Sequence, residues 1–110
     1  NVLYEENTLL QLISEKKSIE LTLNNKITSM LNDLNGRYSK IKSLKNDLLP
    51  KTEQAHALCL KGYSEGRYSR IELIEIHIRL FEIKEQLLNE LSEYHSVLIE
   101  LESITKNIIR

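Results

Sequence analysis

Three histidines and one cysteine are the side chains in this sequence best suited to metal or proton chemistry. Glu53-x-x-His56 places a carboxylate and an imidazole on one face of a helix, a spacing used by di-iron helical bundles. Such bundles also need a second Glu-x-x-His pair and two further glutamates, and the sequence contains no second pair. A solvated helix face therefore accounts for Glu53 and His56 better than a metal site does.

The remaining candidates for chemistry are isolated from one another along the chain. His77 and His95 lie too far apart on one helical stretch to share an ion within it, and His95 falls on an apolar stripe, which favours a packed or interface residue. Cys59 is the only cysteine and is expected to pack as a small apolar residue. Because no nucleophile–base set or glycine-rich phosphate loop is present, the sequence predicts no enzyme, no cofactor and no metal site.

The composition predicts an all-α protein. Three Gly and one Pro in 110 residues are too few for the frequent turns of a sandwich, a barrel or a Rossmann unit. A formal net charge of −1 provides no basic field, which argues against nucleic acid as a partner. No stretch approaches the roughly 18 to 20 consecutive apolar residues of a membrane-spanning helix.

The second half of the chain predicts a helix with a coiled-coil seam, because apolar residues recur at spacings of three and four. Two successive fours, from Ile83 to Leu87 to Leu91, form a stutter that locally unwinds a supercoil. A second apolar stripe beside the seam predicts neighbours on two sides, or the broad core face of a helical bundle. The seam comprises Leu73, Ile76, Leu80, Ile83, Leu87, Leu91, Tyr94, Leu98, Leu101 and Ile108, with Thr105 completing the last interval, and the second stripe comprises Ile71, Ile74, Ile78, Phe81, Leu88, His95 and Ile99.

The first half predicts a weaker helix of the same kind. A break at Gly36 would give a three-helix bundle, but Tyr38 and Ile41 keep the apolar phase, so we favour a continuous helix. Pro50 removes a backbone donor and predicts a kink near Leu48. The expected seam here is Leu9, Leu12, Ile19, Leu23, Ile27, Met30, Leu34, Tyr38, Ile41 and Leu48.

Residues 62–69 predict the firm break between the two helices. Gly66 supplies turn geometry, and Ser69 with Glu72 forms a capping box at the start of the returning helix. The prediction is one long antiparallel hairpin over residues 1–110, with a first arm at 1–61 and a returning arm at 70–110. The returning arm pairs back only to about residue 22, so we expect the start of the first arm to be covered from outside the chain.

From Leu48 to Ile104 the sequence resembles the TolC family of outer-membrane efflux channels, in particular the heavy-metal and cation efflux branch (CzcC-like and CusC-like). In that family the helix begins again at a Leu-Pro-x-x-Glu-x-Ala motif after a break. A turn follows, with an aromatic residue three positions before a Gly. A Ser or Thr comes soon after that Gly, and an acid comes six residues after it. Asn and Lys replace the Ala-rich composition usual in these helices. The matching residues are Leu49, Pro50, Glu53 and Ala55, then Tyr63, Gly66, Ser69, Glu72 and Leu73, and the helix through Glu93, Tyr94 and His95 to Leu101.

The resemblance implies a trimeric channel whose outer-membrane β-barrel continues into a periplasmic tunnel walled by long α-hairpins. This chain would be one such hairpin, in the periplasmic part of an outer-membrane protein of a Gram-negative cell. Its tip would dock onto the periplasmic adaptor (membrane fusion) protein, and so indirectly serve an inner-membrane pump; the exported ion would pass down the lumen without a fixed site. By matching position, the implied docking and aperture residues are Tyr63, Gly66, Arg67, Ser69, Glu72 and Glu75. A free-standing soluble coiled-coil interaction module is the alternative.

Overall fold

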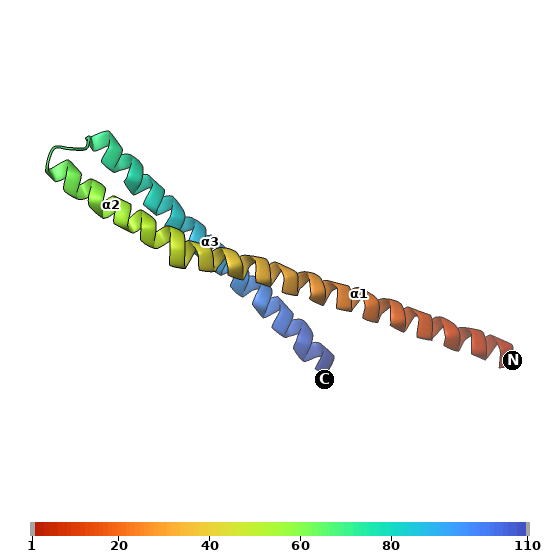
Figure 1. Ribbon diagram of the computed structural model, residues 1–110. Helices are drawn as coiled ribbons and strands as arrows, with labels where there is room; N and C mark the ends of the chain where they lie inside the picture. Colours follow the sequence, from red (N-terminus) through yellow and green to blue (C-terminus); the bar gives the residue numbers. More distant parts are fainter. Residues whose placement is uncertain (1, 110) are drawn as a thin grey trace. The chain divides into compact units, whose positions relative to one another are not determined.

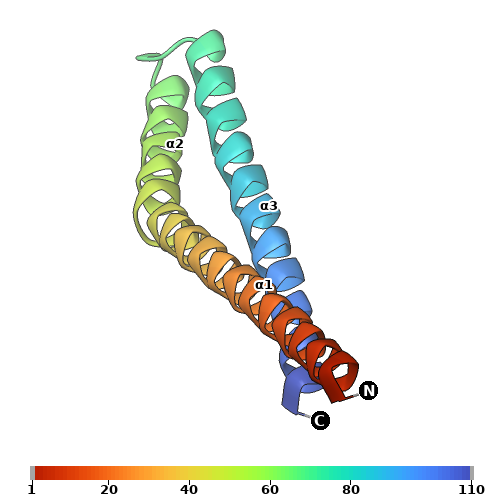
Figure 2. The same ribbon diagram turned by 90° about the vertical axis from the view of Figure 1, so that its right-hand side faces the viewer.

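A computed structural model of the chain describes residues 2–109, which are helical apart from one short turn. The predicted all-α hairpin is confirmed, because the helices on either side of the turn run side by side in opposite directions (Figures 1 and 2). The outermost residues of the predicted arms, Asn1 and Arg110, lie outside the described residues. The elements are α1 (Val2–Ser43), the π-helical segment η1 (Leu44–Leu48), α2 (Leu49–Ser64) and α3 (Arg70–Ile109).

The chain divides between Asp33 and Leu34 into two compact units. The described residues of the first unit, 2–33, all lie in α1. Every described side chain up to residue 22 is exposed, including the predicted seam residues Leu9, Leu12 and Ile19. Within this segment the Thr22 hydroxyl donates to the Ser18 carbonyl oxygen at 2.9 Å, a local bond that leaves the helix intact. That this segment is covered from outside the chain stays a prediction.

Helix α1 passes through Gly36 without a break, so the three-helix alternative is wrong. Leu34 and Ile41 are buried on either side of the glycine, and burying two such side chains outweighs the roughly 1 kcal/mol that Gly costs inside a helix. The prediction that Tyr38 belongs to the seam is wrong, since its side chain is 58% exposed. Arg37 takes that place. It stands three residues after Leu34 and four before Ile41, a spacing that fits a helical seam as well as the position of Tyr38 does, and it has an ionic partner on α3.

The core of the second unit lies along the seam between the two arms. Leu44 and Ile83 are its most buried apolar side chains, at 5% and 4% exposed. The seam predicted on α3 is confirmed from Leu73 to Leu101, but beyond it Ile104 is half-buried whereas Thr105 and Ile108 are exposed. The second stripe is exposed along its whole length, at Ile71, Ile74, Ile78, Phe81, Leu88, His95 and Ile99.

The predicted kink before Pro50 takes the form of a π-helical turn. The Leu49 N–H donates to the Leu44 carbonyl oxygen five residues back, and Pro50 then occupies the first turn of α2, where its missing N–H costs little. Figure 2 shows the helix changing direction here, between the end of α1 and α2. On the exposed side, the Lys51 ammonium donates a hydrogen bond to the Asp47 carboxylate, and this bond together with the negative charge of Asp47 raises the pKa of Lys51 above its usual value.

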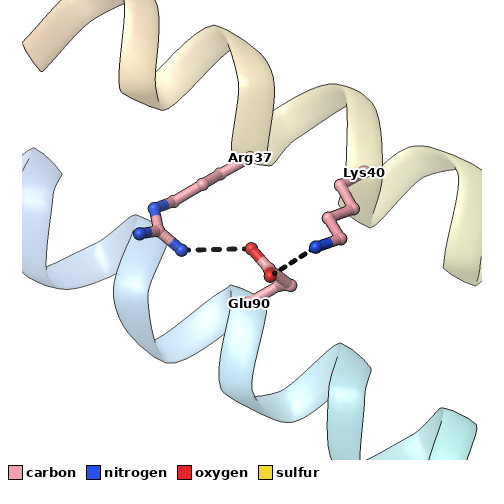
Figure 3. Close-up of polar contacts among 3 residues, drawn as sticks. All are labelled: Arg37, Lys40 and Glu90. Atoms are coloured by element: carbon pink, nitrogen blue, oxygen red, sulfur yellow. Dashed lines mark hydrogen bonds and ion pairs between the residues drawn. The ribbon is translucent and has the colours of Figure 1, made fainter. Parts of the chain in front are cut away.

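An ionic cluster joins the arms beside the seam (Figure 3). Arg37 Nη1 lies 3.2 Å from Glu90 Oε2, and Lys40 Nζ lies 3.3 Å from Glu90 Oε1. The Glu90 side chain is only 15% exposed, so its charge is compensated mainly by these two cations rather than by water. One carboxylate on α3 therefore holds two successive turns of α1 at a fixed register.

We expect Glu90→Gln to lower the free energy of unfolding by about 1–2 kcal/mol, because both cations lose a partly desolvated ionic partner. Urea unfolding followed by circular dichroism measures the change. Asp47→Asn is the matched control: it removes an ion pair with Lys51 that is shorter, at 2.8 Å, but mostly exposed to solvent, so we expect a much smaller effect than that of Glu90→Gln. Equal losses in the two variants would show that the cluster does not stabilise the hairpin.

Candidate functional site: the hairpin tip

The turn at residues 65–69 closes α2 with a Schellman motif. Gly66 has φ of +78°, a left-handed conformation that costs glycine nothing, so the predicted role of this residue is confirmed. Its N–H donates to the Tyr63 carbonyl oxygen at 3.0 Å, and the Arg67 N–H donates to the Gly62 carbonyl oxygen at 2.7 Å. Helix α2 extends to Ser64, so the turn is shorter than predicted.

The predicted capping box at the start of α3 is confirmed. The Ser69 Oγ accepts the Glu72 N–H at 3.2 Å, and Glu72 Oε2 accepts the Ser69 N–H at 3.3 Å. A carboxylate in this position also meets the positive end of the α3 dipole. The Glu72 side chain is therefore held in place by its hydrogen bond from the Ser69 backbone N–H.

A second glycine at the tip has a packing role that the sequence analysis missed. Gly62 is buried, and a Cβ built there would collide with the ring of Tyr68. Glycine thus permits the chain after the turn to fold back so that the ring of Tyr68 lies directly against Gly62 on α2. The signal for it in the sequence is an aromatic residue six positions after a glycine in the last turn of a helix, and this pattern can be interpreted only when the position of the turn is known.

We expect Gly62→Ala to destabilise the hairpin when Tyr68 is present and to stabilise it by up to about 1 kcal/mol when Tyr68 is Ala. Alanine favours the helix by about that amount, but the new Cβ must displace the tyrosine ring. A double-mutant cycle of urea unfolding free energies measures the coupling. If Gly62→Ala has the same effect in both backgrounds, the proposed contact does not contribute.

The predicted docking residues share the tip but do not form one bonded cluster. Tyr63 on the last turn of α2 is 42% exposed, and Glu75 is exposed on α3 one turn after Glu72. Arg67 forms an ion pair with Glu65, a residue that the sequence analysis did not single out. We call Tyr63, Arg67, Glu72 and Glu75 the tip surface: an aromatic ring, two acids and a cation whose charge is already partly neutralised.

Two histidines lie across the arms from each other, close to this tip. His77 Nδ1 on α3 is 3.4 Å from His56 Nε2 on α2, and the ring centroids are 5.4 Å apart. In the sequence, the spacing of His56 relates it to Glu53 and that of His77 relates it to His95, and neither spacing predicts this pair. Both residues of the pair stand about two helical turns from the turn at 65–69, so the antiparallel register brings them together.

Comparison with known proteins adds no relative. The chain matches no family model, no curated protein and no solved structure.

Within residues 2–109, no group of three or more His, Cys, Asp or Glu side chains is placed to hold a metal ion. Over the same residues, no helix is both long and apolar enough to cross a membrane. What the tip offers is a turn capped on both sides, which presents an aromatic side chain and two carboxylates in a defined arrangement. Such an arrangement suits recognition of another protein surface.

Proposed function

We propose that this chain forms the periplasmic helical wall and the adaptor-docking tip of a TolC-like outer-membrane channel in a tripartite cation or drug efflux system. The observation that carries the proposal is the capped turn: Gly66 at positive φ, Ser69 bonded to Glu72, and Tyr63 exposed beside them. These are the residues on which the resemblance to the TolC family rests. The turn supports a docking role because its shape is set by its own hydrogen bonds before any partner arrives.

The apolar surface of α3 supports the wall part of the proposal. Side chains of the second stripe, among them Phe81 at 65% and Leu88 at 67% exposed, remain in solvent when the arms are packed on each other. A hairpin that uses one stripe for its own partner and leaves another uncovered is suited to pack against neighbouring helices on both sides. In a trimeric tunnel, further hairpins of the assembly would cover this stripe.

The wall and the tip would guide an exported ion or drug without chemical change. The tip surface would meet the adaptor through Tyr63 and the two acids, and the lumen would conduct the cargo along the helices. The partners in this proposal are the periplasmic adaptor, two further copies of the parent chain and, indirectly, an inner-membrane pump.

The experiment that tests the proposal measures export in cells carrying the parent gene with its adaptor. Gly66→Val should abolish tolerance to the exported compound, because a β-branched residue cannot adopt φ of +78° without strain and the Schellman turn is lost. The arms are untouched, so trimers should still be recovered from the membrane at the wild-type level. Wild-type tolerance in this variant would refute the docking tip.

A further inference from the structure

The pair formed by His56 and His77 is the one place in the described chain where two strong metal-ligating nitrogens face each other from different helices. His56 Nε2 belongs to α2 and His77 Nδ1 to α3, and they are 3.4 Å apart. Neutral imidazole nitrogen is the commonest protein ligand for transition metals. The proposed channel function makes no use of this pair.

The separation of the two nitrogens matches the coordination of zinc. Zinc–nitrogen bonds are about 2.0–2.1 Å long, and two of them at the tetrahedral angle place their nitrogens roughly 3.3–3.4 Å apart. Ligands at right angles, as in octahedral or square-planar sites, would be only about 2.9 Å apart. We propose that His56 and His77 form a two-histidine zinc site that links the arms of the hairpin.

The surroundings of the pair leave room for such an ion and for the water that would complete its coordination. The two rings border a groove on the hairpin. Its other lining residues, Leu60, Leu73 and Ile74, are apolar and carry no positive charge that would repel a metal ion. His77 is exposed, so an ion can enter directly from solvent. No third protein ligand comes from residues 2–109, and the remaining positions of a tetrahedral zinc ion are therefore open.

Zinc binding also assigns the proton on each ring. With His56 Nε2 and His77 Nδ1 as ligands, the protons lie on His56 Nδ1 and His77 Nε2. Both rings must be neutral to bind the metal, so protons compete with it and the affinity falls as the solution becomes more acidic. Because the two ligands come together only in the folded hairpin, zinc stabilises that state over the unfolded chain.

The test is zinc binding by the metal-free 110-residue chain, measured by equilibrium dialysis at neutral pH together with the melting temperature by circular dichroism. We expect one zinc ion per chain and a rise in melting temperature with zinc. His56→Ala and His77→Ala should each lose the bound ion and the zinc-dependent rise, while their helical spectra without zinc show that they fold. His95→Ala is the matched control, since it removes an exposed histidine elsewhere on α3 and should bind as the wild type does.

The proposal is overturned if the wild-type chain binds no zinc at submillimolar concentrations, or if His56→Ala binds as well as wild type. Loss of binding in His95→Ala would equally overturn it, because the ion would then lie elsewhere. Neither an adaptor nor a membrane enters this experiment. Its failure would leave the export test untouched, and failure of the export test would leave the zinc site standing.

Discussion

In the proposed channel, Glu72→Lys is expected to abolish export while trimers still assemble. The substitution removes the acceptor of the Ser69 N–H and places a cation at the positive end of the α3 dipole. It also reverses one of the two negative charges on the tip surface, where reversal of a charge at a docking interface costs several kcal/mol. Growth on a panel of divalent transition-metal ions, and recovery of the adaptor with the purified channel, measure the two consequences.

Two further variants separate the capping role of Glu72 from its charge. Glu72→Gln can still accept the Ser69 N–H, since glutamine serves in capping boxes, but it carries no charge. Glu102→Lys makes the same reversal at an exposed position of α3 far from the turn and should leave export unchanged. If Glu72→Lys cells grow like wild type, or if Glu102→Lys cells fail equally, the assignment of the docking tip is wrong.

Ile83→Asp is expected to destabilise the paired arms by more than about 4 kcal/mol. Ile83 is 4% exposed, so the change loses the burial of a large apolar side chain and leaves a carboxylate without a partner in the seam. Small helical proteins are stable by only about 5–15 kcal/mol in total, so much of the population should lose its paired structure. Helical content and its urea midpoint, measured by circular dichroism, report the loss.

Ile78→Asp is the matched control for this prediction. It makes the same chemical change on the same helix, but Ile78 is 51% exposed on the second stripe. We expect the stability of the hairpin to change by less than about 0.5 kcal/mol. Self-association measured by sedimentation should weaken, because a charge then stands in the surface proposed to meet neighbouring hairpins. A wild-type chain that is a discrete monomer, indifferent to Ile78→Asp, would favour the free-standing coiled-coil module instead.

Features governed by short stretches of sequence could be predicted. The two helices, the seam from Leu73 to Leu101, the positive φ of Gly66 and the capping box all follow from local rules of periodicity and helix termination. The kink before Pro50 was predicted for the same reason, although its π-helical form was not. These features need no knowledge of what lies across from them.

Features that depend on the register between the arms could not be predicted in the same way. Arg37 replaces Tyr38 in the seam because Glu90 lies opposite, and Gly62 is needed because Tyr68 folds back onto it. The contact between His56 and His77 can be predicted only when the residues of both arms are numbered outward from the turn. The docking residues implied by the resemblance lie at the end of the hairpin, whereas the histidine pair lies about two helical turns away from that end.

The π-helical turn at η1 sets the phase of the part of α1 that belongs to the second unit. It holds one residue more than an α-helical turn, and each residue of an α-helix rotates the chain by about 100°. Across the hairpin, η1 packs on α3, whose sequence carries the stutter from Ile83 to Leu91. If η1 were regular, Leu34 and Ile41 would rotate by that angle out of the seam. The extra residue of η1 thus keeps the apolar side chains before and after Pro50 on the face of the helix that packs against α3.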